Sequence, residues 1–118
     1  MKSILIIGMG LFGQKLAADL SRRGDDVMIV DRDEDVINEL SPHFTGAYIG
    51  DCTNEDVLRS LGVSNFDAVV VTVGSDFQSS LEITALVKEL GAPRVIAKAD
   101  RDIQSKFLLR NGADEVVY

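Results

Sequence analysis

The residues best suited to chemistry are three glycines that follow a short apolar run near the amino terminus, in the order G-x-G-x-x-G. In this pattern the first glycine permits a tight turn, the second lets the backbone approach a pyrophosphate, and the third lets a helix pack on a sheet. A helix that begins at this loop would offer N–H groups and a partial positive charge to phosphate oxygens. The loop therefore predicts a phosphate-binding site formed by Gly8, Gly10, Leu11, Phe12 and Gly13.

An acidic residue stands where a ribose-binding carboxylate is expected. Asp31 lies at the end of the second apolar run, 18 residues beyond Gly13, and a carboxylate there accepts hydrogen bonds from ribose hydroxyls. Because it would repel a 2′-phosphate, the sequence favours NAD(H), or an adenosine phosphate such as ATP, ADP or AMP, over NADP. Arg32 argues against this, since its guanidinium could pair with such a phosphate, but we expect it beside the adenine or in solvent. The plainer alternative is that the glycines only form a turn and Asp31 only caps the next helix.

Two later turns supply further candidates. Asp51 and Cys52 follow the third apolar run, where Asp51 could accept a hydrogen bond from the adenine amino group and Cys52 could lie near the base. Alternatively, Asp51 and Thr53 cap the next helix, which is the interpretation that we favour for Thr53. Beyond the fourth apolar run, the turn over residues 72–76 contains Gly74 and would border the second nucleoside of a dinucleotide.

The elements that must position these residues alternate along the chain. Amphipathic segments separate short runs rich in β-branched residues, which is typical of βαβ units. Most of these runs are apolar at successive positions, as expected for strands covered by helices on both faces, and we expect Tyr48 to be buried in one of them. The strands are predicted over residues 3–7, 26–30, 45–49, 68–72, 94–97 and 115–117, and the helices over residues 12–23, 34–40, 54–61, 77–90 and 103–111.

These elements predict an α/β fold, a Rossmann-like, doubly wound parallel sheet of six strands in the order 3-2-1-4-5-6. The ligand crevice would open at the switch point between the first and fourth strands. The length of 118 residues, with 46% hydrophobic side chains, suits one compact domain with a real core.

Composition excludes several classes of function. The formal charge of −7 disfavours direct binding to nucleic acid or to an anionic membrane surface. No run approaches the roughly 18 apolar residues of a membrane helix, so any membrane connection must come through a partner. With one cysteine no internal disulfide can form, and we expect a cytoplasmic location.

The sequence offers little for catalysis or metal binding. The sole histidine, His43, follows a proline in a loop and is expected in solvent, and Cys52 has no second cysteine with zinc spacing. A redox role for Cys52 ranks below packing or contact with adenine, and the acidic run over residues 31–35 fits a solvated helix start. We therefore predict no catalytic or metal-binding residues, although an NAD-dependent oxidoreductase fragment is the main rival interpretation.

With these residues in place, the chain resembles the RCK/KTN (TrkA-N) family of nucleotide-binding domains that regulate potassium transporters and channels. The likeness runs over nearly the whole chain, and the late Leu-X-X-Gly-Ala-Asp motif makes it far more specific than the glycine loop alone. It rests on Gly10-Leu11-Phe12-Gly13, Val30-Asp31, Gly50-Asp51-Cys52-Thr53, Leu61-Gly62, Phe66-Asp67, Gly74, Ile96-Ala97-Lys98-Ala99 and Leu109-X-X-Gly112-Ala113-Asp114.

The resemblance implies a cytoplasmic regulatory subunit of a Trk- or Ktr-type potassium transport system, held at the inner membrane by its transporter or channel partner. Such subunits pair into homodimers and assemble into octameric rings, and NAD(H), ATP or ADP would bias the ring's conformation. Residues 1–118 would be the RCK N-terminal (TrkA-N) domain, with the C-terminal RCK domain absent from this chain. A stand-alone NAD-responsive sensor would share the same site and differ only in its partner.

The resemblance also assigns individual residues. Lys98 looks like the family's basic residue near the phosphates or the dimer partner. Some Ktr-type members carry an arginine where this chain has Leu11. Its absence puts strong discrimination of ATP from ADP in doubt and favours NAD(H) or a less selective adenosine site. Phe107 and Leu108 are candidates for burial in a dimer, or alternatively for packing on the domain's own sheet.

Overall fold

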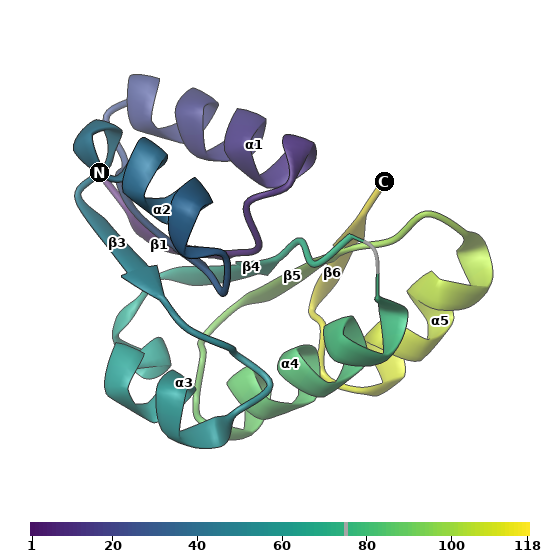
Figure 1. Ribbon diagram of the computed structural model, residues 1–118. Helices are drawn as coiled ribbons and strands as arrows, with labels where there is room; N and C mark the ends of the chain where they lie inside the picture. Colours follow the sequence, from purple (N-terminus) through teal and green to yellow (C-terminus); the bar gives the residue numbers. More distant parts are fainter. Residues whose placement is uncertain (75) are drawn as a thin grey trace.

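Six parallel strands form one sheet in the computed structural model, which describes residues 1–74 and 76–118 (Figure 1). The strand order is β3-β2-β1-β4-β5-β6, which confirms the predicted Rossmann-like topology. Adjacent β1 and β4 lead into connections that run in opposite directions across the sheet, so the switch point lies between them. The strands are β1 (Ser3–Ile7), β2 (Asp26–Asp31), β3 (Gly46–Ile49), β4 (Ala68–Val71), β5 (Val95–Lys98) and β6 (Glu115–Val117).

Helices cover both faces of this sheet. In Figure 1 the first two helices lie on one face and the last three lie on the other. Each predicted helix is present, and its ends differ from the prediction by at most one residue. The helices are α1 (Leu11–Arg22), α2 (Glu34–Leu40), α3 (Glu55–Leu61), α4 (Phe77–Glu89) and α5 (Asp102–Arg110), with short 3-10 helices η1 (Ser41–His43) and η2 (Val63–Asn65).

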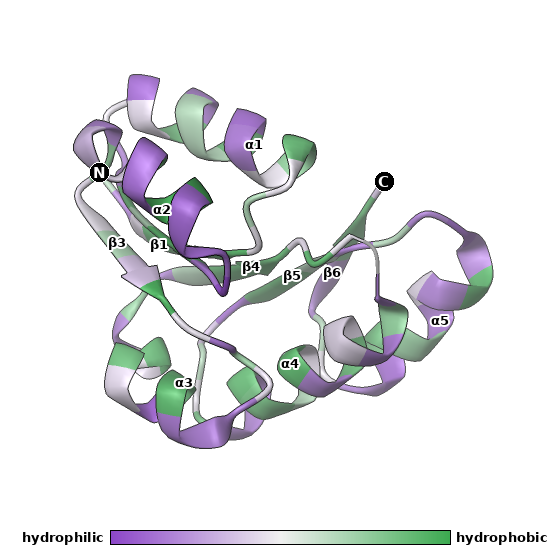
Figure 2. Ribbon diagram, in the orientation of Figure 1, coloured by the Kyte–Doolittle hydropathy of each residue, from purple (hydrophilic) through white to green (hydrophobic). Residues whose placement is uncertain are grey.

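The core forms on both sides of the central strands, because successive side chains of a strand point to opposite faces. Leu5 and Val69 belong to the cluster packed beneath α3, α4 and α5, whereas Ile6 and Val70 belong to the cluster beneath α1 and α2. Figure 2 shows the hydrophobic colour running along β1 and β4. Burial on both faces explains why β1 is apolar over residues 4–7 and β4 is apolar throughout. None of the described helices is both long and apolar enough to cross a membrane.

Two sequence predictions are wrong in detail, and one open alternative is decided. Tyr48 is 47% exposed, because β3 is an edge strand of the sheet and the carboxyl end of this strand is poorly covered. Thr53 does not cap α3: its amide and hydroxyl both donate to Asp51, and Asn54 caps the helix by accepting from the Asp56 amide. Of the two alternatives for Leu108, the structure shows packing in the domain's own core, where the residue is fully buried and unavailable to a dimer interface.

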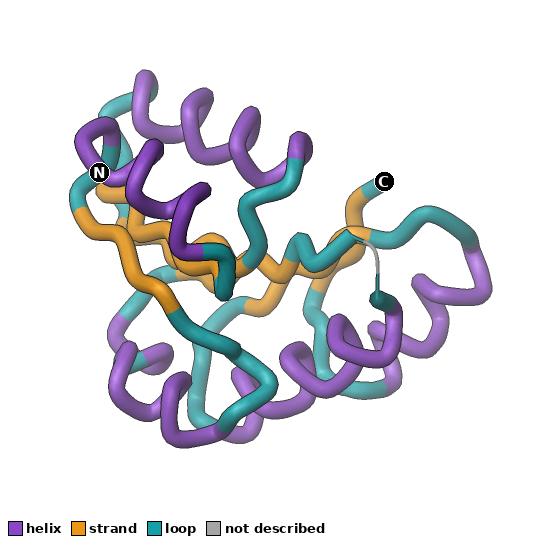
Figure 3. Tube along the Cα trace, in the orientation of Figure 1, coloured by secondary structure: helices purple, strands orange, loops and turns teal. Residues whose placement is uncertain are grey.

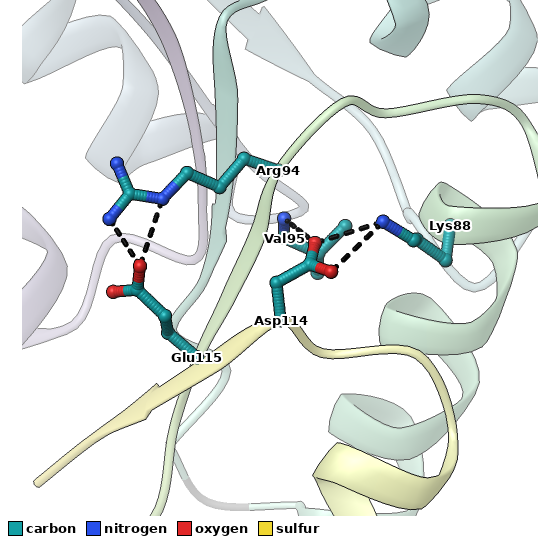
Figure 4. A network of polar contacts seen from close by, with 5 residues as sticks. All are labelled: Lys88, Arg94, Val95, Asp114 and Glu115. Carbon is teal, nitrogen blue, oxygen red and sulfur yellow. Dashed lines mark hydrogen bonds and ion pairs between the residues drawn. The ribbon is translucent and has the colours of Figure 1, made fainter.

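Polar contacts join the last strand to its neighbours at the amino ends of β5 and β6 (Figure 4). Asp114 accepts from the Val95 amide at 2.8 Å and from Lys88 Nζ at 2.9 Å. These hydrogen bonds, with that of Val95 the larger, hold the pKa of Asp114 below its usual value. Arg94 forms an ion pair with Glu115 beside them. The contacts fix the register of β6 at the amino ends of the strands, away from their carboxyl ends.

Candidate functional site

A cavity of about 380 Å³ opens at the carboxyl ends of β1, β2 and β4. In Figure 3 the loops that follow β1 and β4 diverge, one toward α1 and the other toward α4 on the opposite face. The cavity brings together candidate residues from four separate stretches of sequence. Those that line it are Gly8, Gly10, Asp31, Arg32, Asp51, Cys52 and Gly74. The turn that carries Gly74 includes Ser75, which lies outside the described residues.

The three glycines of the loop differ in what surrounds them. A Cβ on Gly8, whose φ is +99°, would lie 2.9 Å from the Thr72 carbonyl oxygen, and one on Gly13 would lie 2.0 Å from the Gly8 carbonyl oxygen. A Cβ on Gly10 would have no atom within 4 Å beyond those of Gly10 itself and its two chain neighbours. The packing of the domain therefore requires the first and third glycines, whereas the second leaves open space in the cavity.

Helix α1 begins at this loop with Gly10 as its N-cap residue and with no side-chain cap. The first intrahelical bond runs from the Gln14 amide to the Gly10 carbonyl at 2.9 Å, so the amides before Gln14 have no acceptor within the helix. The first turn also contains no acidic residue. The positive end of the helix dipole thus faces the open space above Gly10, where an anion would be stabilised.

Leu11, Phe12, Gly13 and Lys98 do not line the cavity. The Leu11 side chain is 89% exposed, so this residue can offer the cavity only its backbone. Lys98 lies with its ammonium 5.4 Å from the centroid of the Phe12 ring and 2.6 Å from a carboxylate oxygen of Asp100. In this arrangement the Lys98 ammonium contacts the ring of Phe12, on the glycine loop, and the Asp100 carboxylate, and it does not reach the cavity.

Asp31 ends β2 and touches the glycine loop directly. Its Oδ2 accepts from the Met9 amide at 2.7 Å, and its Oδ1 accepts from the Asp33 amide at 2.9 Å. Asp31 does not cap α2, because that role falls to Asp33, which accepts from the Asp35 and Val36 amides. Each carboxylate oxygen can accept more than one hydrogen bond, so Asp31 can hold the loop and accept ribose hydroxyls at the same time.

Charged groups surround the mouth of the cavity. Hydrogen bonds from Thr53 hold the pKa of Asp51 below its usual value, and the nearby Arg32 guanidinium adds to this effect. Asp76, the N-cap residue of α4, likewise has a lowered pKa because it accepts from the Ser79 hydroxyl and amide, with a smaller contribution from Arg32. Arg32 is thus an exposed cation at the cavity, near enough to both carboxylates to favour their ionised forms. From there it could stack on a flat base or face solvent.

Within the part of the chain that the structure describes, the cavity holds no activated thiol and no set of metal ligands. Burial raises the pKa of the Cys52 thiol to about 12, so the thiol is protonated and unreactive near neutral pH. His43 is exposed in η1 and does not line the cavity. Among the described residues no group of three histidine, cysteine or acidic side chains is placed to hold a metal ion.

Sequence reasoning missed the role of Thr72, which directly follows β4. Its hydroxyl is buried and donates to the carbonyl oxygens of Gly8 at 2.7 Å and Ile7 at 3.1 Å. The one signal in the sequence was a hydroxyl residue at the carboxyl end of the strand across the switch point from the glycine loop.

The sequence and the fold match known proteins throughout. The model of the TrkA-N domain family matches residues 4–118. The Ktr system potassium uptake protein C of Bacillus subtilis is 42% identical over 117 residues, which are 99% of this chain and 53% of that protein. The chain therefore spans about half the length of this relative.

Among the solved structures that share the fold are two with sequence identity of 25% or more. One is the NAD(P)-binding domain of an exopolyphosphatase-related protein from Archaeoglobus fulgidus, with a TM-score of 0.87 and 26% identity over 99% of this chain and 87% of that one. The other is the AMP-bound form of the Kef CTD from Shewanella denitrificans, with a TM-score of 0.80 and 25% identity over 98% of this chain and 70% of that one.

Proposed function

The chain belongs to the TrkA-N domain family, and from that premise we propose that it is the nucleotide-binding regulatory domain of a potassium transport system. Three comparisons support this function. The B. subtilis relative is named as a potassium uptake protein, and the two solved structures are described as binding NAD(P) and AMP. In this proposal the domain binds a nucleotide, and the bound nucleotide changes the activity of a membrane partner.

The observation that carries the proposal is the open space above Gly10 beside the Asp31 carboxylate, both within one cavity. The phosphates of the ligand would rest against Gly10 and the first amides of α1. The ribose hydroxyls would donate to Asp31, and the adenine would lie toward Asp51 and Cys52. In a dinucleotide the second nucleoside would extend past Gly74. NAD(H) fits this path over its full length, and AMP, ADP or ATP would occupy its first half.

Regulation requires that the ligand bind two conformations of the protein with different affinity. We place those conformations in a homodimer or octameric ring that works beneath a potassium transporter or channel in the cytoplasmic membrane. A C-terminal RCK domain in the intact protein would complete this assembly. The exposed Phe107, at 41%, is the residue of α5 that we assign to a contact between subunits.

Calorimetry on the purified protein tests this function. Titration with NAD, NADH, ATP, ADP and AMP is expected to show saturable binding of one nucleotide per chain, with no turnover of hydroxy or carbonyl substrates when NAD or NADH is present. Hydride transfer to such a substrate would instead support the rival oxidoreductase. Failure of all five nucleotides to bind would remove the proposal.

A further inference from the structure

One peptide group of the glycine loop is hydrogen-bonded at both of its ends. Its carbonyl, from Gly8, accepts from the Thr72 hydroxyl at 2.7 Å, and its N–H, from Met9, donates to Asp31 Oδ2 at 2.7 Å. Thr72 directly follows β4 and Asp31 ends β2, and these two strands flank β1 on either side. The strands next to β1 therefore hold the loop that leaves β1.

The space around this peptide group leaves it little room to turn. Thr72 is only 4% exposed, and its hydroxyl lies 2.8 Å from the position that a Cβ on Gly13 would take. The Gly8 amide also donates to the Val30 carbonyl at 2.8 Å. Rotation of the peptide would break the bonds to Thr72 and Asp31 together. The loop therefore leaves the sheet in one direction, which sets where Gly10 and the start of α1 lie.

We propose that Thr72 is a positioning residue for phosphate, which acts by fixing the Gly8–Met9 peptide so that Gly10 and the first amides of α1 face the ligand. This inference rests on the proposed nucleotide function and extends it to a residue across the switch point. The Thr72 hydroxyl satisfies the Gly8 carbonyl, and without this hydrogen bond less would oppose a turn of the carbonyl's partial negative charge toward the phosphate. Loss of the hydroxyl should therefore weaken binding of the phosphate more than binding of the nucleoside.

The test compares AMP with adenosine, which carries the same base and ribose but no phosphate. Thr72→Val keeps the shape of the side chain and removes the hydroxyl, and it is expected to weaken AMP binding roughly threefold to tenfold while changing adenosine binding less than twofold. Thr72→Ser keeps the hydroxyl and should restore the affinity for AMP. Thr45→Val is the matched control, because it removes a hydroxyl bonded to Asp26 at the amino ends of β2 and β3, away from the cavity. It should leave both affinities unchanged.

Several outcomes would overturn the inference. Binding of AMP by Thr72→Val as tight as by the unaltered protein, or an equal proportional loss of AMP and adenosine affinity in this variant, would show that the hydroxyl does not act on phosphate. Absence of AMP and NAD binding in the unaltered protein would instead remove the proposed function itself. Should Thr72→Val fail to fold, Thr72→Ala removes the same hydroxyl with a smaller side chain, and its ratio of AMP to adenosine affinity decides the question.

Discussion

The carbonyl oxygen of Gly8 occupies the space that a side chain on Gly13 would need, because a Cβ there would lie only 2.0 Å from that oxygen. The conflict is with backbone at the base of the loop, so neither group can move without displacing β1 or α1. Gly10, three residues earlier, has no such conflict. The domain thus separates a glycine needed for folding from a glycine needed, in our proposal, for the ligand.

The first prediction follows from that contrast. Gly13→Ala should lower the free energy of unfolding by about 1–3 kcal/mol or more through overpacking, as measured by urea denaturation. Gly10→Ala should cost much less stability, since its Cβ meets open space, but should weaken binding of AMP and NAD. Equal losses of stability in the two variants would contradict the assignment of different roles to the two glycines.

The second prediction concerns Asp31. Asp31→Ala removes the acceptor for the ribose and for the Met9 amide, and it should weaken binding of NAD and AMP by about 1–3 kcal/mol in calorimetry. Circular dichroism should show that the fold persists, because the residue is only half-buried at the end of its strand. Unchanged nucleotide affinity would remove Asp31 from the site.

A third prediction addresses the choice between the two nicotinamide dinucleotides. A carboxylate near the 2′ position repels a phosphate there by about 1 kcal/mol or more, so NAD should bind at least roughly fivefold more tightly than NADP. Competition titrations at constant ionic strength measure this ratio. If NAD and NADP bind the unaltered protein equally well and Arg32→Ala then prefers NAD, Arg32 instead pairs with the 2′-phosphate of NADP.

The Cys52 thiol provides a prediction on pH. Its pKa is about 12 in the folded protein against 9.0 for an unperturbed thiol, mainly because it is buried. The folded state therefore keeps a proton that the unfolded state releases, so this contribution to stability is complete below pH 9 and declines as the pH rises toward 12. By pH 10 the free energy of unfolding should fall by about 1 kcal/mol relative to pH 7 on account of this group.

Urea denaturation from pH 7 to pH 10 tests this decline, with Cys52→Ala as the control for other groups that titrate in the same range. The difference in stability between the two proteins should shrink as the pH rises. A difference that stays constant over this range would mean that the thiol titrates normally and is more accessible to water than its burial indicates.

Local patterns were enough to predict most of the fold. The glycine spacing and the alternation of strands and helices predict the sheet order, because each depends on residues close together in sequence. The helix caps are harder: Thr53 and Asn54 are adjacent and both suited to capping, and only the hydrogen bonds from Thr53 to Asp51 decide between them. The exposure of Tyr48 depends on what covers the outer strand, which no local pattern contains.

The candidate site was likewise predictable only where it depends on a local sequence pattern. Gly8, Gly10 and Asp31 were found because their spacing is a known pattern, and the structure places all three on one cavity. Thr72 was missed because its contact with Gly8 joins residues 64 apart in the sequence. Lys98, assigned from the family resemblance, lies at Phe12 and Asp100 outside the cavity, so any contact with phosphate requires a different side-chain conformation or a second subunit.

The most direct measurement of the central claim is a titration of ¹⁵N-labelled protein with AMP, followed amide by amide in solution NMR spectra. We predict saturable shifts that are largest at Gly10, Leu11 and Phe12, the amides at the start of α1, with smaller shifts at Asp31. Gly112, whose turn lies against Lys88 of α4, should be unaffected. Saturable shifts confined to residues outside both the glycine loop and the cavity, or spectra that do not change with millimolar AMP, would contradict the claim that phosphate rests on the amino end of this helix.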